Sequence, residues 1–307
     1  MFIVNHRRFF FWLTGLILAG SIGAIVVWGL PLGIDFKGGS LMQVEYPAGR
    51  PSIETIQKQV AAIPTGEISV RASGENAVNI RTSALTPEEH TAILNALSQV
   101  GTTGSTSSPQ ATEIAFTSVG PALGAQFTTK ALWALLAVAL AIVLYIAWAF
   151  RKVSRPVPSF AYGLVVVLML AIDIIVPTGF FAAYAHFTGA EVDSLFVVAL
   201  LALLGYCVND VIVVFDRVRE HLHQNEKTGV REEFEVTVGK SIDETMIRSI
   251  NTSLTTALAL VALVWFGAEA TRNFALVMFV GVVIGAFSSI CRSAPLLIPL
   301  AKWFAKK

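Results

Sequence analysis

The chain is poor in charged residues. Lysine, arginine, aspartate and glutamate make up 14% of its 307 residues, whereas a typical soluble domain has about 25%. Hydrophobic residues make up 54%. This shortage of charge predicts a membrane protein, and the net charge of +1 gives no reason to expect a nucleic-acid partner.

Cysteine is also scarce. The two cysteines, Cys207 and Cys291, both lie in apolar stretches, and none of the five histidines pairs with a cysteine at ligand spacing. We therefore expect neither a disulfide framework nor a metal site. The sequence predicts a protein without a cofactor.

Six apolar stretches are long enough to cross a bilayer, which takes about 20 helical residues. They cover residues 9–30, 131–150, 157–187, 195–214, 249–266 and 273–304. The first stretch follows two arginines and exceeds the length of a signal-peptide core, so we expect an uncleaved anchor. The sequence predicts an α-helical polytopic membrane protein with six transmembrane helices.

The loops between these stretches differ in their content of lysine and arginine. Basic residues gather in RKVSR (151–155), in the segment 216–248 and in the tail with Lys302, Lys306 and Lys307, whereas the opposite loops hold only Arg272. The positive-inside rule places both termini in the cytoplasm. We therefore expect a first helix within 1–30, an extracytoplasmic domain at 31–130, and five helices within 131–307 with a cytoplasmic helical connection at about 216–248.

The hydrophobic period changes within residues 31–130. LMQVEY alternates as in a strand, SIETIQKQVAAI has helical spacing, and EISVRA and AVNIRT flank a turn. TPEEHTAILNALSQV begins with Thr86 and Glu89 at capping-box spacing, and after the polar loop 101–110 the segment ATEIAFTS is typical of a last strand. The order β-α-β-β-α-β predicts an α+β ferredoxin-like domain between the first and second helices.

Two carboxylates fall inside predicted spans, Asp173 and Asp210. A charge near the bilayer centre costs roughly 2.5–3.5 kcal/mol on insertion scales, and a carboxyl group taken out of water can titrate near neutral pH. Asn209 precedes Asp210 but is turned about 100° away on the helix, while Tyr206 and Cys207 share the face of Asp210. A static interhelical hydrogen bond is the alternative for Asp210, and Asp173 could instead bond a backbone kinked by the nearby proline.

The fifth span offers Asp210 a partner. One row of this span holds Arg248, Thr252 and Thr255, and the adjoining row holds Ser249, Ser253 and Thr256. We expect such a polar stripe to face the interior of the bundle or a water path. If Arg248 approaches Asp210, it favours the ionised acid, and protonation would release the arginine. That predicts a two-state element biased by one cation.

Five motifs together resemble one known family. GIDFKGG (33–39), SVGPALG (118–124), GYCVNDVIVVFDRVRE (205–220), RSINTSLTT (248–256) and FVGVVIGAFSSI (279–290) occur in the order typical of SecF, the smaller subunit of the SecDF complex of bacterial protein export. The resemblance covers nearly the whole chain. It implies a fold related to the resistance–nodulation–division superfamily, in which two six-span halves form twelve spans.

The resemblance also implies a function. A SecF subunit is not an enzyme; it uses the proton or sodium motive force to promote late stages of pre-protein export at the inner membrane, together with SecD and the SecY channel. Asp210 and Arg248 match the family's intramembrane acid and arginine, and Asp173 stands where relatives also carry an acid. The other expected ion-transfer residues are Asn209, Thr252, Thr255 and Thr256.

Arg292 departs from this family pattern, because a small or apolar residue is expected there. We expect its side chain to extend to the cytoplasmic interface. Movement of the extracytoplasmic domain is the expected output of the cycle, with hinges at the connections that carry proline and glycine. These hinge residues are Pro31, Gly33, Gly120, Pro121 and Gly124.

Other functions remain open on the sequence. The chain could be a self-associating proton-coupled transporter of a lipid or small molecule, or a passive scaffold whose buried polar groups only fix helix packing. An intramembrane aspartyl protease is disfavoured, because Asp210 follows Cys-Val-Asn rather than the Gly-x-Gly pattern of such enzymes. The sequence does not distinguish H⁺ from Na⁺ as the coupling ion.

Overall fold

The computed structural model describes residues 2–47, 49–63, 66, 68–99, 111–150, 157–230 and 232–304. The chain divides into two compact units. Unit 1 comprises Met1–Pro31 and Leu132–Lys307, and unit 2 comprises Leu32–Ala131. The predicted loop 101–110, the basic segment 151–155 and the tail residues Lys306 and Lys307 lie outside the described residues.

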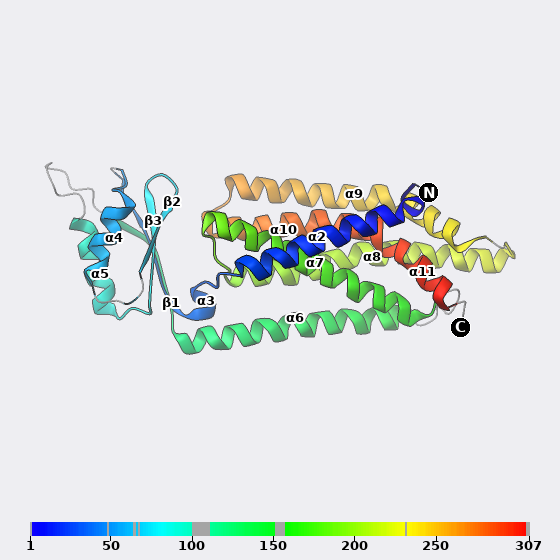
Figure 1. Cartoon of the computed structure of the whole chain (residues 1–307), viewed down its shortest axis with the longest axis horizontal. Coiled ribbons are helices and arrows are strands. Elements are labelled where there is room, and N and C mark those ends of the chain that lie inside the picture. Colours follow the sequence, from blue (N-terminus) through cyan, green and yellow to red (C-terminus); the bar gives the residue numbers. More distant parts are fainter. Residues whose placement is uncertain are drawn as a thin grey trace. The chain divides into compact units, whose positions relative to one another are not determined.

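Long apolar helices make up unit 1 (Figure 1). After the short α1 (Phe2–Asn5) come α2 (Arg7–Trp28), α6 (Pro121–Ala149), α7 (Ser159–Thr188), α8 (Ser194–Thr228), α9 (Phe234–Phe266) and α10 (Glu269–Ser288). Within the described part of the chain, six helical segments are long and apolar enough to cross a membrane. The prediction of a polytopic membrane protein with six spans is confirmed.

The sixth span is not one regular helix. α10 is followed by a π-helix, η1 (Ser289–Ser293), and then by α11 (Ala294–Phe304). A π-turn inserts one extra residue into the helical path and changes which side chains face inward beyond it. The apolar run at 273–304 predicts one uninterrupted span, so this irregularity is a difference from the prediction.

The helix ends between the fourth and fifth spans follow from capping. α8 continues to Thr228 and stops at Gly229, whose left-handed φ of 71° suits glycine. α9 begins after Glu233 and continues without a break through Arg248 into the fifth span. Ser241 lies buried inside α9, and its hydroxyl donates to the carbonyl of Thr237 at 2.8 Å.

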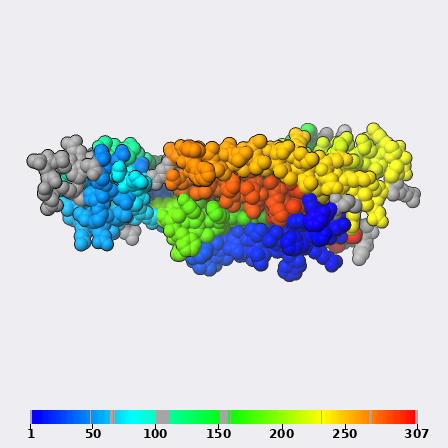
Figure 2. All heavy atoms as spheres, turned by 90° about the horizontal axis from the view of Figure 1, so that it is seen from above, coloured from blue at the N-terminus to red at the C-terminus, as the bar shows by residue number. Residues whose placement is uncertain are grey.

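The centre of unit 1 is formed where α7, α8 and α10 pack together, with α2 against α7 and α9 against α10. Figure 2 shows α9, α10, α7 and α2 as successive rows on one face. Glycines permit the closest approach: a Cβ on Gly281 would lie 2.3 Å from the Leu203 side chain, and a Cβ on Gly285 would lie 2.5 Å from Cys207 Sγ. The inner faces of α8 and α10 are therefore held tightly against one another.

Unit 2 is an α+β fold. Its strands are β1 (Gly39–Glu45), β2 (Ser69–Ser73), β3 (Ala77–Thr82) and β4 (Thr112–Val119), and its helices are α3 (Ile34–Lys37), α4 (Ile53–Ala61) and α5 (Pro87–Gln99). The sheet order is β2-β3-β1-β4 with every neighbouring pair antiparallel. This arrangement confirms the ferredoxin-like prediction.

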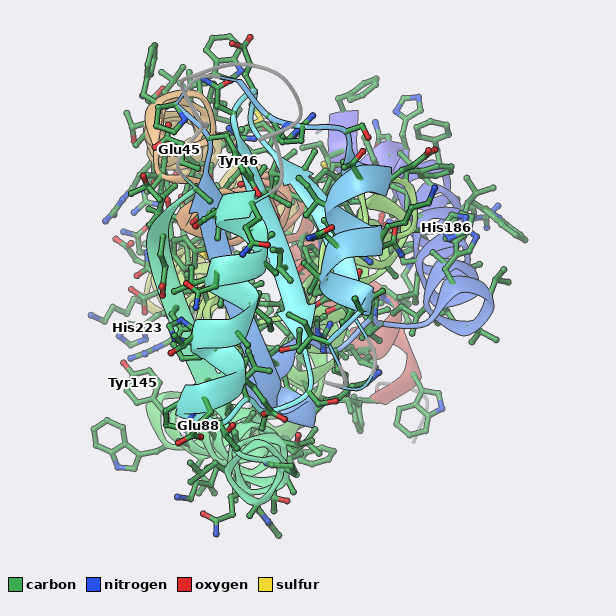
Figure 3. The ribbon with its side chains drawn as sticks, turned by 90° about the vertical axis from the view of Figure 1, so that its left-hand side faces the viewer. Glu45, Tyr46, Glu88, Tyr145, His186 and His223 are labelled. Atoms are coloured by element: carbon green, nitrogen blue, oxygen red, sulfur yellow. The ribbon has the colours of Figure 1, made fainter. Side chains whose placement is uncertain are left out.

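In Figure 3, α4 and α5 lie side by side in front of the strands, with Glu88 at the start of α5 and Tyr46 after the end of β1. The buried core between helices and sheet includes Val44, Ile56 and Ile93. The capping box that begins α5 is present: Thr86 N–H donates to Glu89 Oε2 at 2.8 Å, and Glu89 N–H donates to Thr86 Oγ1 at 3.3 Å.

Candidate functional site

Asp210 lies on the buried face of α8 and is 4% exposed. It accepts a hydrogen bond from the hydroxyl of Ser253 on α9, and the charge of Arg248 acts on it. Its Oδ2 atom has no hydrogen-bond partner among the described residues. An ionised carboxylate pays a large desolvation cost in such a place, so this arrangement favours a group that takes up a proton or another cation. Asn209 is exposed and faces away from this site.

The two polar rows of α9 point in different directions. Ser249 and Ser253 are buried against the bundle. Arg248, Thr252 and Thr255 are exposed on this chain, and the hydroxyls of the two threonines donate back to the α9 backbone at 2.9 Å (to Arg248 O) and 3.0 Å (to Asn251 O). The structure therefore brings the second row to Asp210 and leaves Thr252 and Thr255 on the outer side.

Tyr206 links the same two helices one turn before Asp210. Its hydroxyl lies 3.4 Å from Ser253 Oγ and 3.3 Å from Thr256 Oγ1. Ser253 thus stands between the Tyr206 hydroxyl and the Asp210 carboxyl. The surroundings of Asp210 consist of hydroxyl groups that can rotate to donate or accept, as a site for a proton or a small cation requires.

Asp173 forms the second polar centre and is 2% exposed on α7. Its Oδ1 atom lies 3.5 Å from Nη2 of Arg292, which is itself 3% exposed. The expectation that Arg292 extends to the interface is therefore wrong. The π-helix η1 carries Arg292, and its altered winding turns the guanidinium inward.

Cys207 separates the two carboxylates. It lies on α8 within electrostatic reach of both Asp173 and Asp210, and it also contacts α10, where its thiol lies 3.9 Å from the carbonyl of Gly281. Ser288 of α10 completes the surroundings of Asp173. The bundle therefore contains two buried acids on adjacent helices, Asp173 beside Arg292 and Asp210 under the charge of Arg248, with the Cys207 thiol in reach of both.

The predicted hinge residues belong to two connections. Pro31 accepts a hydrogen bond from Val192 N–H at 2.8 Å within unit 1, and Gly33 is the N-cap of α3. At the second connection, α6 begins at Pro121 directly after Gly120 and continues as one helix. A hinge at either connection stays a prediction.

Within unit 2, the turn at Gly38 after α3 packs closely against the start of α6 at Pro121 and Gly124. Gly38 has φ 79°, and a Cβ there would lie 2.8 Å from Pro121 Cα; a Cβ on Gly124 would lie 2.8 Å from Gly38 N. These contacts with backbone atoms leave no room for side chains. The start of α6 and the Gly38 turn therefore fit together as one closely packed piece.

Ion pairs gather at one end of the bundle. Glu235 at the start of α9 contacts Arg7 of α2 at 3.3 Å and Lys302 of α11 at 2.5 Å. Arg217 of α8 pairs with Glu244 of α9. Partly exposed charged pairs of this kind contribute little stability, but they mark the end of the bundle that meets water, whereas Asp210 and Asp173 lie in its apolar part.

Comparison with known families matches both parts of the chain. The family described as protein export membrane protein SecD/SecF, C-terminal, matches residues 99–303, and the SecD/SecF GG motif matches residues 23–46. The second match contains the Gly38 turn, and the first contains both buried acids.

Similar proteins include the protein translocase subunits SecF of Thermobaculum terrenum, 36% identical, and of Anaerolinea thermophila, 32% identical. Each alignment covers 96% of this chain and 92% of the relative.

Among solved structures, the crystal structure of SecDF from Thermus thermophilus, a translocon-associated membrane protein, has a TM-score of 0.78 at 26% identity and is matched over 97% of this chain and 38% of its own. The crystal structure of SecDF in a super-membrane-facing form has a TM-score of 0.66 at 26% identity, and the match covers 99% of this chain and 39% of that chain. This chain thus spans less than half of those longer chains. With the family match over residues 99–303 and relatives above 30% identity along almost their whole length, the chain belongs to the SecF family of protein translocase subunits.

Proposed function

We propose that this chain is an accessory subunit of the Sec translocase that uses the proton or sodium motive force to promote late stages of pre-protein export. The proposal includes SecD and the SecY channel as partners and involves no enzymatic step. The observation that carries it is the Asp210 carboxyl, which is buried, has one oxygen without a partner among the described residues, lies beside Ser253, and is acted on by the charge of Arg248.

The energy available from one ion fits a mechanical role. One elementary charge that crosses 100 mV supplies about 2.3 kcal/mol, and the two states of a packed domain typically differ by a few kcal/mol. When Asp210 is ionised it attracts Arg248, and when it binds a cation that attraction is lost. Binding and release of a cation at Asp210 would therefore switch the electrostatic attraction between α8 and α9 off and on.

The outer side of α9 supports a membrane-embedded partner. Arg248, Asn251, Thr252 and Thr255 are exposed there, at the start of the apolar part of α9, and Figure 2 shows α9 uncovered along its length on the face in view. Polar side chains that face lipid are costly and are normally turned toward protein or water. A second set of helices, as SecD would supply, satisfies this requirement.

The proposed orientation has both termini in the cytoplasm of a bacterial inner-membrane protein. The charged side chains of Arg7, Arg217, Glu235, Glu244 and Lys302 pair with one another near the N-terminus of α2, the C-terminal part of α8 and the start of α9. This concentration of charge at one end supports contact with water there, and the excess of lysine and arginine in the loops supports the cytoplasmic side.

Gradient-driven export in vesicles tests the proposal. Vesicles that hold the Sec translocase, SecD and either this chain or its Asp210→Asn variant receive first an H⁺ gradient and then a Na⁺ gradient. Asparagine keeps the size of the side chain but cannot ionise, so Asp210→Asn should lose gradient-dependent export. Asp216→Asn is the matched control, because Asp216 lies on the same helix with its side chain 68% exposed, and it should export normally.

The result also separates the alternatives. Full export by Asp210→Asn would favour a passive scaffold and would contradict the proposal. Purification of the chain without a SecD partner, together with gradient-driven uptake of a lipid or small molecule, would favour a self-associating transporter.

A further inference from the structure

Asp173 and Asp210 are both buried, but Asp173 lies 3.5 Å from the buried guanidinium of Arg292, whereas the arginine that acts on Asp210, Arg248, is exposed. We propose that Arg292 keeps Asp173 ionised as a fixed counter-ion, so that Asp173 does not carry the transported cation in this chain. Arg292 is then a positioning residue, and Asp210 alone exchanges the cation. This inference deepens the proposed ion-coupled function and rests on it.

The π-helix gives Arg292 an enclosed position. The side chain is 3% exposed. Its Nη2 atom contacts Asp173 Oδ1 at 3.5 Å and the carbonyl of Ile284 at 3.3 Å, and its guanidinium lies 5.4 Å from the centre of the Phe287 ring. A guanidinium does not lose its proton in proteins. The bundle therefore contains a permanent positive charge that needs a negative charge beside it.

Asp173 is the only carboxylate among the described groups that act on Arg292, so it is the counter-ion of this arginine. Among the described residues, the ionisable side chains that act on Arg292 are Asp173, Cys291 on η1 and Cys207 on α8. A buried thiol is normally uncharged. Asp210 is not among the groups that act on Arg292, and the segment 9–28 of α2, which packs against α7, holds no ionisable residue.

Protonation of Asp173 would consequently leave Arg292 without a charged partner inside the bundle. Breaking a buried pair by neutralising one member is strongly unfavourable, whereas replacing both members by neutral groups of similar volume is often tolerated. Loss of Arg292 removes the constraint, and Asp173 then becomes a buried acid without a cation, which favours uptake of a proton. Asp173 should therefore stay ionised when Arg292 is present and take up a proton when Arg292 alone is replaced. Replacement of both residues should remove this titration.

Infrared difference spectroscopy tests the pair directly. The complex of this chain with SecD is compared between about pH 8 and about pH 6, where exposed carboxyl groups with ordinary pKa values stay ionised. The wild type should show no protonated-carboxyl band that Asp173→Asn removes. Arg292→Met should show a new band, and the double variant Asp173→Asn/Arg292→Met should lack it.

Export in vesicles gives the functional counterpart. Arg292→Met should shift the pH dependence of gradient-driven export, because a second acid now titrates. The double variant should regain the wild-type pH profile with a rate within about twofold of the wild type, since it contains neither buried charge.

Several results would overturn the inference. One is an Asp173-dependent band in the wild type, and another is the absence of a new band in Arg292→Met. A third is a double variant that assembles with SecD but is as inactive as Asp210→Asn. If the double variant does not assemble, the wild-type and Arg292→Met spectra still decide. The spectra do not depend on the behaviour of Asp210→Asn, so failure of the proposed function is recognised separately by full export in that variant.

Discussion

Replacement of Gly285 by alanine should force α10 away from α8. A Cβ on Gly285 would lie 2.5 Å from Cys207 Sγ but 3.5 Å from Cys207 Cβ, and ordinary contacts begin at 3.4 Å. The clash therefore comes from the sulfur atom alone and corresponds to a displacement of about 0.9 Å, the difference between 3.4 and 2.5 Å. Cys207 is 1% exposed, so the sulfur is enclosed by protein and cannot turn out to the surface without repacking. Overpacking of this kind costs about 1–3 kcal/mol.

Removal of the sulfur atom should remove that cost. In the Cys207→Ala background the nearest neighbour of the new methyl group is the Cβ atom of residue 207 at 3.5 Å, so Gly285→Ala should change stability by less than about 0.5 kcal/mol. Thermal unfolding of the four purified variants in detergent measures the coupling. Gly205→Ala on α8, where a Cβ meets nothing within 4 Å, is the control and should be neutral or stabilising.

Equal destabilisation by Gly285→Ala in both backgrounds would refute the reasoning. It would mean that the methyl group meets something other than the Cys207 sulfur, and that the thiol between the two buried acids is not held by α10. A coupling of at least about 1 kcal/mol would instead show that the packing of α8 on α10 depends on this contact.

Three further perturbations test other parts of the structure. Gly38→Ala should destabilise unit 2 by at least about 1 kcal/mol more than Gly74→Ala in thermal unfolding, because both glycines have positive φ but only Gly38 has α6 backbone atoms within 3 Å of a Cβ. The hydrogen bond from Lys240 lowers the pKa of Glu232. This pair therefore stabilises the start of α9 at neutral pH, and the stabilisation is lost as the pH falls through the lowered pKa. Hydrogen exchange at the start of α9 should show this acid dependence in the wild type and not in Lys240→Met. Tyr206→Phe removes two long hydrogen bonds to α9 hydroxyls and should cost no more than about 1 kcal/mol in stability, and an unchanged pH dependence of export would show that this hydroxyl does not influence Asp210.

The sequence was sufficient for the elements whose signals are local. Apolar runs of about 20 residues predict spans whatever their neighbours, and the alternation of strand and helix patterns predicts the ferredoxin-like order of unit 2. The Thr86–Glu89 capping box was also recognised, because its bonds join residues three apart. The buried position of Asp210 followed from its place in an apolar helix, where an exposed charge would face lipid.

The inward faces of α9 and of the last span depend on tertiary packing. A 3.6-residue period tells which residues share a face of α9, but it does not tell which of two adjoining polar rows faces the bundle. The row with Ser249 and Ser253 is buried, whereas Thr252 and Thr255 are exposed. Arg292 was missed for a different reason: the π-helix changes the rotation of the chain by one residue, and periodicity assumes that no such change occurs. The departure of Arg292 from the family pattern was the only signal.

The exposure of the two arginines determines which acid can act as a switch. An ion pair can open only if its cation has another favourable place to go when the acid is neutralised. Arg248 is exposed on the outer side of α9, so it can be released toward water or toward a partner's polar group. Arg292 is enclosed between α7, α8 and α10, with Asp173 as the carboxylate that acts on it among the described residues, and neutralisation of Asp173 would leave its charge where it is. Asp173 therefore stands beside a charge that stays in place when the acid is neutralised, whereas the charge that acts on Asp210 belongs to an exposed side chain that can move away.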